Sequence, residues 1–415
     1  MYIKRSIGFP KSKKAYLIYF GFNKREWAIA SGIVLGILIF SIVLYGKLTS
    51  YAGNCVAADM LPAEFEEQQS VWLMWPSEIY NVHNDPVEPV ILELVRNLAP
   101  YVKINIMVAN KSEAAEIKKK LARQDCADSN IDYHVVDHYS IWARDVGPLF
   151  VKDKNQRLCV VDFRFNNYGR YGDHYYINTE DQVDSEIAKK LRFPLIESSL
   201  VSEGGSVESN GQGTLILTEA VTVRHNPGMS RDQIEKEYKR VLGAKKVIWL
   251  KHGLAEDKVT GGHVDEFVRF TDARTILLAE VLPADKDSSS LAEKSGIYLE
   301  ENYNILLRAV DRNGQPFRII RIPMPPTMYG DAGIDDEIPV RSYMNYVVTN
   351  GAVIVPTYWK PGRPQVLKDT EDEVLKTFRA VFPGREIIRI DAEAINSWGG
   401  GLHCVTQHMP TVTSD

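Results

Sequence analysis

The sequence Trp398-Gly399-Gly400-Gly401-Leu402-His403-Cys404 places a cysteine just after a run of three glycines. Without Cβ atoms, such a run can bend through positive φ and bring the backbone close to a ligand. Thiolate is the nucleophilic form of cysteine, and it needs an electropositive setting and a base supplied from elsewhere. Cys404 is therefore a candidate nucleophile, and the alternative is a buried structural cysteine beside a glycine hinge.

Four earlier segments also combine glycine or an aromatic residue with a polar group. They are Trp142–Pro148, Glu203–Ser206, Gly261–Glu266 and Tyr343–Asn345. From Asp145 through Glu203, Asp265 and Asn345 to Cys404, the steps are 58, 62, 80 and 59 residues. Near-equal steps predict a supersecondary unit repeated around an axis, with each unit giving one polar group to a shared centre.

The regions between these segments alternate between strand and helix patterns. Residues 70–75 and 102–108 have strand patterns, and residues 86–99 and 111–123 have helical spacing. The alternation continues to residue 390 without a Pro/Ser-rich linker. The sequence therefore predicts one mixed α/β domain over residues 61–412.

The amino-terminal part of the chain has a different composition. Residues 1–26 form a basic segment, residues 27–46 are apolar and uncharged, and residues 47–60 have the character of a tether. The apolar run is just long enough to cross a bilayer, and its basic flank predicts that the preceding end stays cytoplasmic. We expect a transmembrane helix or signal anchor with the domain in the periplasm or exterior. Cleavage after Val56-Ala57-Ala58, giving a secreted protein, is the alternative.

Charge and cysteine content limit the partners. The net charge is −5, with +6 in residues 1–26 and therefore −11 in the remainder. An acidic body argues against nucleic acid and fits a cationic small substrate. The cysteines, Cys55, Cys126, Cys159 and Cys404, have no metal-type spacing. In an oxidising compartment a pair of them can bridge, but the sequence leaves the pair open.

His263 and Asp265 are the strongest candidates for an acid/base pair. Two residues apart in a strand, they would share one face, with Val264 and Glu266 pointing away. An imidazole beside a carboxylate is suited to proton transfer, and a core histidine is the alternative. His403 is a rival base, but it is adjacent to Cys404 and faces away from it if the segment is extended.

Asp145 supplies a second carboxylate. It follows Arg144, so a surface ion pair is the plain interpretation, but Trp142 and Gly147-Pro148 surround it with apolar and rigid residues. Two carboxylates in one pocket repel unless a cation lies between them. A planar guanidinium group matches paired carboxylates. These residues therefore indicate attack by a cysteine on a guanidinium carbon.

Residues 61–410 resemble the agmatine deiminase and bacterial peptidylarginine deiminase family, within the guanidino-group-modifying superfamily. The matching motifs are WARDVGP (142–148), FNNYG (165–169), EGGS (203–206), GGHVDE (261–266), NGAVIVP (350–356), IDAEAI (390–395) and GGGLHCVTQ (399–407). The resemblance implies a five-bladed pseudosymmetric α/β propeller, the pentein fold. It also implies a reaction that requires no metal and no organic cofactor.

The resemblance implies a role for each site residue. Cys404 would be the nucleophile, His263 the acid/base, and Asp145 and Asp265 the guanidinium clamps. Glu203 would contact the substrate or support the histidine. We also expect Trp142 and Asn345 to contact substrate. Arg164 would bind a carboxylate if the substrate has one, and is otherwise a strand-edge arginine.

Three functions stay open on the sequence. The first is hydrolysis of agmatine to N-carbamoylputrescine and ammonia through a cysteine thiouronium intermediate. The second is the same chemistry on peptidyl or free arginine outside the membrane. The glycine loop favours the second, because agmatine deiminases usually have Asn-Ile where this chain has only Leu402. FNNYG, EGGS and CVTQHMP are nearer the agmatine type, and agmatine is the expected substrate. The third is a guanidinium-binding module without turnover.

Overall fold

The computed structural model describes residues 55–81, 85–126, 128–170, 172–326 and 340–412. The chain divides into two compact units, residues 1–53 and 54–415. The predicted basic segment, apolar segment and first part of the tether lie outside the described residues. Within the described ranges, no helix combines the length and the apolar character that crossing a membrane requires.

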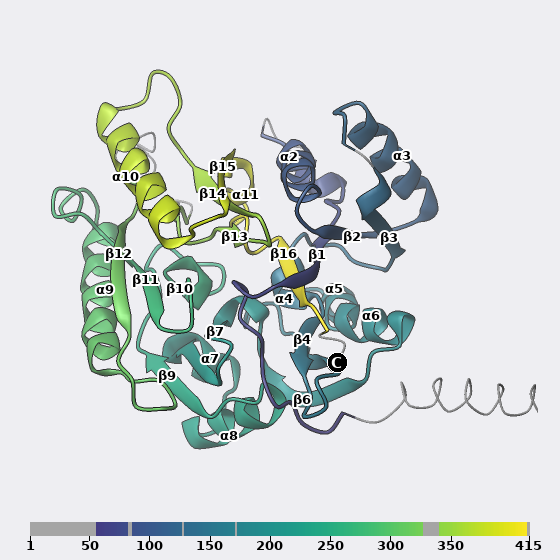
Figure 1. Cartoon of the computed structure of the whole chain (residues 1–415), viewed down its shortest axis with the longest axis horizontal. Coiled ribbons are helices and arrows are strands. Elements are labelled where there is room, and N and C mark those ends of the chain that lie inside the picture. Colours follow the sequence, from purple (N-terminus) through teal and green to yellow (C-terminus); the bar gives the residue numbers. More distant parts are fainter. Residues whose placement is uncertain (1–54, 82–84, 127, 171, 327–339, 413–415) are drawn as a thin grey trace, which may run out of the picture. The chain divides into compact units, whose positions relative to one another are not determined.

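Five small mixed sheets make up the described unit, and one strand arrangement recurs in each (Figure 1). A short inner strand pairs antiparallel with a central strand. The central strand pairs parallel with a third strand that follows a helical connection. We call each sheet with its helices a blade. The repeated α/β unit predicted from the spacing of polar residues is confirmed.

The first two blades each have two helices in the connection. Blade one contains β4 (Leu149–Lys152), β5 (Leu158–Arg164), α5 (His174–Glu180), α6 (Val183–Leu191) and β6 (Leu195–Val201). Blade two contains β7 (Val207–Ser209), β8 (Thr214–Thr218), α7 (Glu219–His225), α8 (Arg231–Val241) and β9 (Lys246–Leu250).

The next two blades each have one long helix. Blade three contains β10 (Val268–Phe270), β11 (Thr275–Glu280), α9 (Ser290–Arg308) and β12 (Arg318–Pro323). Blade four contains β13 (Val347–Val348), β14 (Ala352–Thr357), α10 (Gln365–Val381) and β15 (Glu386–Asp391).

The fifth blade joins the two ends of the domain. Its inner strand β16 (Thr406–Pro410) pairs with β1 (Gln68–Met74), so the last strand of the chain completes the sheet that the first strand begins (Figure 1). The blade continues with η1 (Glu78–Asn81), α2 (Glu88–Leu98), β2 (Lys103–Val108), α3 (Lys111–Ala122), η2 (Asp128–Asn130) and β3 (Ile131–Val135).

Burial explains the strand sequences. The central strands β8 (TLILT) and β14 (AVIVPT) read as nearly continuous apolar runs, because both of their faces are covered. The outer strands β12 (RIIRIP) and β15 (EIIRID) are only partly buried and carry charged residues. The inner strands thus lie closest to the centre of the domain, and the segments that precede these strands extend into that centre.

Helix caps fix where the outer helices start. Asn110 and Ser289 accept hydrogen bonds from the backbone nitrogens of Glu113 and Ala292, at 3.0 Å each. Ser230 and Gln233 form a reciprocal capping box at the start of α8. These side chains satisfy helix-start amides that would otherwise lack partners.

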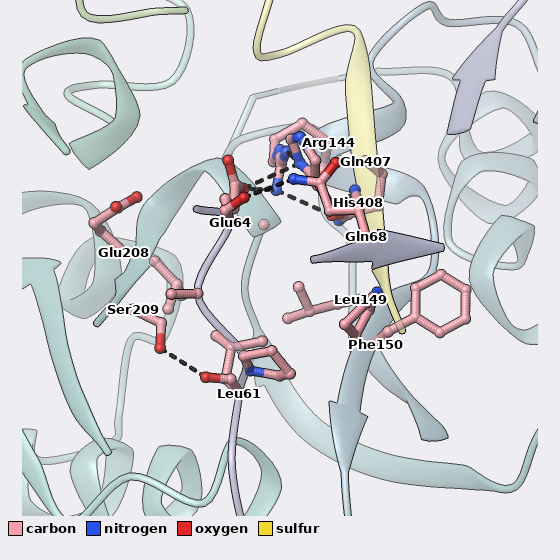
Figure 2. Close-up of a pocket in the computed structure, with 15 residues that line it drawn as sticks. Leu61, Glu64, Gln68, Arg144, Leu149, Phe150, Glu208, Ser209, Gln407 and His408 are labelled. Atoms are coloured by element: carbon pink, nitrogen blue, oxygen red, sulfur yellow. Dashed lines mark hydrogen bonds and ion pairs between the residues drawn. The ribbon is translucent and has the colours of Figure 1, made fainter. Parts of the chain in front are cut away.

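The segment from Cys55 to Glu64, here called the strap, packs on the domain. The backbone nitrogen of Ala58 donates to Arg240, and Met60 forms a β-bridge with Lys152. The carbonyl of Leu61 accepts a hydrogen bond of 2.8 Å from Ser209 Oγ (Figure 2). The described residues of the predicted tether, 55–60, thus pack on the domain.

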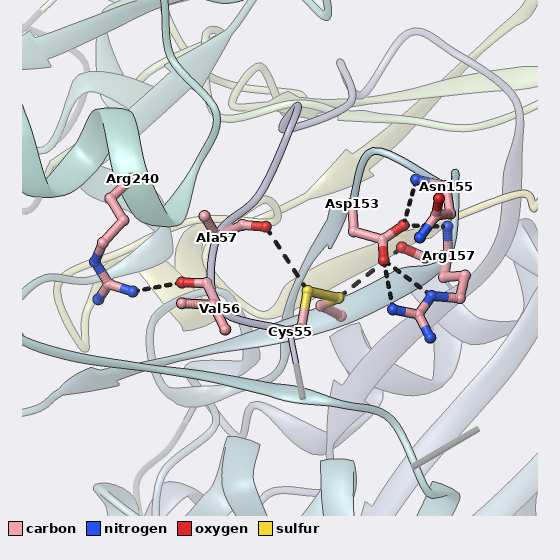
Figure 3. Close-up of a disulfide and its surroundings, with 8 residues drawn as sticks. Cys55, Val56, Ala57, Asp153, Asn155, Arg157 and Arg240 are labelled. Carbon is pink, nitrogen blue, oxygen red and sulfur yellow. Dashed lines mark hydrogen bonds and ion pairs between the residues drawn. A yellow bond between two sulfur atoms is a disulfide. The ribbon is translucent and has the colours of Figure 1, made fainter. Parts of the chain in front are cut away.

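A disulfide fixes the start of the strap. Cys55 bonds to Cys159 on β5, a pair 104 residues apart in sequence (Figure 3). The sequence alone did not show which cysteines form a disulfide, and the structure pairs Cys55 with Cys159. Cys126 and Cys404 form no disulfide, so the candidate nucleophile keeps its thiol.

We expect loss of this disulfide to destabilise the domain. A bridge that closes so long a loop restricts the unfolded chain, and its removal costs about 2–4 kcal/mol. The test is urea unfolding of the oxidised protein and of Cys55→Ser with Cys159→Ser. Cys126→Ser, which leaves the bridge intact, is the control. Equal unfolding midpoints for the double variant and the control would contradict the expectation.

Candidate active site

The five predicted polar groups occupy equivalent positions in the five blades. Each one lies shortly before an inner strand: Asp145 before β4, Glu203 before β7, Asp265 before β10, Asn345 before β13 and Cys404 before β16. Three of them belong to or adjoin short helices, namely α4 (Ala143–Val146), η3 (Gly204–Ser206) and η4 (Val264–Glu266). The sequence predicted that these five groups converge on one centre, and their contacts are described next.

Gly205 shows how closely His263 approaches two of these groups, Asp145 and Asp265. A Cβ atom on Gly205 would lie 2.6 Å from His263 Nδ1, 2.9 Å from Asp145 Oδ1 and 3.1 Å from Asp265 Oδ2. Only a glycine leaves this space free. The backbone nitrogen of Gly205 also donates to Asp145 Oδ1 at 3.1 Å.

Asp145 is buried and is held from two sides. Besides Gly205, the hydroxyl of Tyr168 donates to its Oδ2 at 2.9 Å. Burial raises the pKa of Asp145 to about 6, and Asp265 and Glu203 add to the rise, against the lowering effects of His263 and Tyr168. The carboxyl group is thus poised between its neutral and charged forms near neutral pH.

Tyr168 is a site residue that the analysis of single residues missed. It and Asn167 have φ of 57°, in the left-handed region that costs a non-glycine residue about 1–2 kcal/mol. This conformation presents the Tyr168 hydroxyl to Asp145 and its ring edge-on to His263, with centroids 5.9 Å apart. The FNNYG motif was the available signal, but it did not show which of its residues acts.

His263 lies among carboxylates. Its Nδ1 is 3.7 Å from Asp145 Oδ1, and its Nε2 is 3.5 Å from Glu203 Oε2. Burial lowers the pKa of His263, but Asp145 and Glu203 outweigh it and raise the pKa to about 10. The imidazolium form of the ring is therefore favoured near neutral pH, and this form can donate a proton.

Glu203 joins two histidines. Its carboxylate lies 3.1 Å from Nδ1 of His225, a residue on α7 that the sequence did not single out. Burial opposes the charged form, but contacts with His225 and His263 lower the pKa of Glu203 to about 2. Glu203 is thus a permanent anion that orients His263.

The strand predicted for residues 263–266 is wrong. Val264–Glu266 form a 3-10 helix, and His263 precedes it. Gly261 and Gly262 have φ of 82° and 115°, which turns the chain out of an extended course. His263 and Asp265 still face the same centre, as the space beside Gly205 shows.

The prediction that Glu266 points away from the site is also wrong. Its Oε1 lies 3.6 Å from Cys404 Sγ and accepts a hydrogen bond of 2.8 Å from Asn345 Nδ2. Burial and the neighbouring Asp265 raise the pKa of Glu266 well above its usual range.

Cys404 sits on a turn rather than in an extended segment. Asn345 donates to Sγ at 3.2 Å, and Asp265 Oδ2 lies 3.7 Å from Sγ. Burial, then Asp265, Glu266 and Asp145, raises the pKa of the thiol well above its usual range. The thiol is protonated in this state, and a cation bound between the carboxylates would favour the thiolate.

Most of the run 399–401 consists of glycine because a side chain would clash with its neighbours, and less because the backbone adopts positive φ. Of the three, only Gly399 has positive φ, at 95°. A Cβ on Gly400 would lie 2.6 Å from the Trp142 ring and 3.2 Å from Cys404 Cβ. Trp142 therefore packs against the backbone just before Cys404.

His403 is not the partner of the thiol. Its Nδ1 lies 2.7 Å from Asp265 Oδ2, and its Nε2 lies 2.8 Å from Glu64 Oε2, on the side of the strap. The sequence argument against His403 as the base agrees with this arrangement, although the extended segment it assumed is absent.

Arg164 lies apart from these contacts. Its side chain is 61% exposed and pairs with Asp181 at 3.1 Å. It is the strand-edge arginine of the alternative interpretation. Arg144, in contrast, is buried and pairs with Glu64 at 2.5 Å. The sequence allowed a surface ion pair between Arg144 and Asp145. In the structure, Arg144 instead pairs with Glu64 in the interior.

Two clusters of potential metal ligands lie in this region. One consists of Asp265, Glu266 and Cys404, and the other of Glu64, His403 and His408. In the first, burial and neighbouring charges raise the pKa values of Glu266 and Cys404. In the second, Glu64 pairs with Arg144.

A ring of five mixed α/β blades, with a cysteine, a histidine and carboxylates drawn from different blades, defines the pentein fold of guanidino-modifying enzymes. Residues 60–410 match the family model of the Porphyromonas-type peptidyl-arginine deiminases. The chain belongs to this family of agmatine and peptidyl-arginine deiminases, and it is a hydrolase of that family.

Individual relatives agree with the family match. An agmatine deiminase from Medicago truncatula is 29% identical over 387 residues, covering 85% of this chain and 96% of that protein. One from Pseudomonas aeruginosa (strain LESB58) is 28% identical over 373 residues, covering 84% and 95%. The structure of the Enterococcus faecalis agmatine deiminase superposes with a TM-score of 0.75 at 24% identity, covering 87% of this chain and 100% of that one, and supports the fold.

Gly205→Ala should reduce turnover by about 100-fold, the scale on which small displacements of reacting groups act. The added methyl group would push His263, Asp145 and Asp265 apart. Steady-state ammonia release measures the effect. The control is Gly296→Ala in α9, where the nearest atom is the flexible Lys286 Cε at 3.3 Å. Undiminished activity in Gly205→Ala would contradict the geometry described for the centre.

Proposed function

We propose that this protein hydrolyses the guanidinium group of agmatine, giving N-carbamoylputrescine and ammonia. The observation that carries the proposal is a set of buried, unfilled hydrogen-bonding positions. Among the described residues, no hydrogen bond satisfies Oδ1 of Asp265, and the ring nitrogens of His263 have only the longer contacts with Asp145 at 3.7 Å and Glu203 at 3.5 Å. A guanidinium group offers donors to Asp145 and Asp265, and its departing nitrogen can accept the proton of His263.

The proposed reaction begins when the cationic substrate binds and the thiol proton leaves to solvent. Cys404 Sγ then forms a bond to the guanidinium carbon. As this tetrahedral adduct collapses, a carbon–nitrogen bond breaks, and His263 protonates the leaving group, which departs as ammonia. The remaining thiouronium is attacked by water whose proton passes to His263. Cleavage of the carbon–sulfur bond, with the hydroxyl proton of this second adduct passing to sulfur, releases the ureido product and restores the Cys404 thiol.

Two lines of support favour agmatine. The relatives from Medicago truncatula and Pseudomonas aeruginosa, similar over nearly their whole lengths, are agmatine deiminases. The acidic body of the chain also attracts a substrate with two positive charges.

A second candidate is deimination of arginine in peptides. The description of the matching family names peptidyl-arginine deiminases. The Cys55–Cys159 disulfide also favours an oxidising compartment, where polyamine synthesis is not expected. Arg164 no longer supports this candidate, because its guanidinium group pairs with Asp181.

We also propose that the domain works outside the cytoplasm, attached through residues 27–46 or released by cleavage. The disulfide and the basic flank of the apolar run support this location. Spheroplast preparation followed by protease treatment of intact spheroplasts tests it, and a domain that stays protected from protease would refute it.

A substrate panel separates the candidate functions. The oxidised protein is incubated with agmatine, free arginine and an arginine-containing peptide, and ammonia is measured. We expect turnover of agmatine to exceed turnover of the other two. Turnover of the peptide alone would establish the second candidate, and none with any substrate, with Cys404 reduced, would favour a binding module.

Cys404→Ser should abolish turnover while agmatine still binds, because the clamp residues are unchanged. Isothermal titration calorimetry measures the binding, and Cys126→Ser, which changes a buried cysteine outside the centre, is the matched control. Retained turnover in Cys404→Ser would mean that another residue is the nucleophile.

The KM for agmatine should rise as the pH falls through about 6, where Asp145 becomes neutral and loses its attraction for the guanidinium group. Below that pH the rise approaches roughly tenfold per pH unit for a single required carboxylate. Because the Tyr168 hydrogen bond lowers the pKa of Asp145, Tyr168→Phe should move the inflection to higher pH. Steady-state kinetics across the pH range measures both, and an inflection that Tyr168→Phe leaves in place would contradict the assignment to Asp145.

A further inference from the structure

Glu64 lies behind the catalytic centre, on the strap. Its carboxylate contacts Arg144 Nη1 at 2.5 Å and Arg269 Nη2 at 2.6 Å. It also lies 2.8 Å from His403 Nε2. Figure 2 shows the Glu64 side chain directed toward Arg144 and His408 beside a small cavity. The reaction proposed above makes no direct use of any of these groups.

His403 connects this cluster to the substrate clamp. One ring nitrogen faces Glu64, and the other lies 2.7 Å from Asp265 Oδ2. The ring is buried and so cannot rotate without breaking both contacts. With Oδ2 engaged in this way, Asp265 Oδ1 is the oxygen left without a hydrogen bond among the described residues.

The charge of Glu64 matters for the protonation of this ring. An ionised carboxylate only accepts hydrogen bonds, so each short contact is a hydrogen bond when the facing ring nitrogen carries a proton. Arg144, His403 and other cations outweigh burial and hold the pKa of Glu64 well below its usual range. Burial, Arg144 and Arg269 draw the proton from His403 by lowering its pKa, and Glu64 opposes them.

We propose that Glu64 is a positioning residue for the deiminase reaction. It acts through His403 to fix Asp265 with one carboxylate oxygen presented to the guanidinium group. This role rests on the proposed function, since it concerns the same guanidinium clamp. Two successive contacts connect these residues. Glu64 on the strap contacts His403 before β16, and His403 contacts Asp265 in η4 before β10.

A neighbouring residue provides a matched control. Glu208 is buried in the same cluster and contacts Arg269 Nε at 3.2 Å, as Glu64 contacts Arg269 Nη2. The contacts of its carboxylate are with Arg269 and the backbone nitrogen of Phe270. Glu208→Gln therefore perturbs the shared arginine without acting on the histidine directly.

The test measures agmatine binding by calorimetry in the inactive Cys404→Ser protein. Glu64→Gln keeps the shape of the side chain and removes its charge. It should raise Kd about tenfold, the scale of one weakened charge-assisted hydrogen bond. In the active protein, KM should rise by a similar factor while kcat changes much less. Glu208→Gln should leave both constants close to those of the parent.

A double-mutant cycle decides whether the effect passes through His403. In the His403→Asn background, Glu64→Gln should have no further effect on Kd, because the connecting ring is gone. An equal rise of Kd in both backgrounds, or an equal rise caused by Glu208→Gln, would overturn the proposal. Circular dichroism checks folding, and Glu64→Asp, which keeps the charge but withdraws it from the ring, replaces Glu64→Gln if that variant fails to fold.

A measurement without substrate keeps this proposal separate from the proposed function. Proton NMR of the full chain should show a downfield imidazole N–H signal that disappears in His403→Asn. We expect Glu64→Gln to shift or remove this signal and Glu208→Gln to leave it unchanged. A signal unaffected by Glu64→Gln overturns the positioning role whichever guanidino compound proves to be the substrate. Absence of ammonia release from every substrate, with the signal responding as expected, refutes the proposed function alone.

Discussion

The repulsion among buried carboxylates is the constraint on which the catalytic centre depends. Asp145, Glu203 and Asp265 surround one histidine, and all are buried. Such a group is costly unless positive charge lies among its members. His263 supplies one charge and acquires a pKa of about 10 as a result. A guanidinium group bound among these carboxylates would reduce their repulsion, which adds to burial in raising the pKa of the Cys404 thiol.

The fold makes this arrangement possible because no single element carries it. Each blade contributes one polar group just before its inner strand, and interior contacts join the blades. The backbone nitrogen of Arg144 donates to the Cys404 carbonyl at 3.1 Å, and Ser342 Oγ donates to the Glu266 carbonyl at 2.6 Å. The backbone can therefore hold like charges at fixed separations. Flexible side chains that all came from one helix would instead move apart.

The sequence predicted the repeat and the main residues of the centre because both leave local marks: periodic spacing and glycine beside polar groups. It did not predict what depends on contacts between distant segments. The course of His263–Glu266 follows from the φ angles of Gly261 and Gly262, and those angles decide that Glu266 faces Cys404. Glu64 meets His403 across 339 residues of sequence. The Cys55–Cys159 pair has the same long-range character.

The strap, Cys55 to Glu64, leads into the catalytic centre, because Glu64 contacts His403. It starts at a disulfide on β5 and ends with Glu64 at His403, so both ends are fixed to the blades that they connect. Cleavage after Val56-Ala57-Ala58 would separate Cys55 from the peptide that carries Glu64. The bridge would then retain only a detached fragment, and the strap would lose its covalent anchor. A chain that uses Glu64 to hold Asp265 therefore has a physical reason to remain continuous from Cys55 onward.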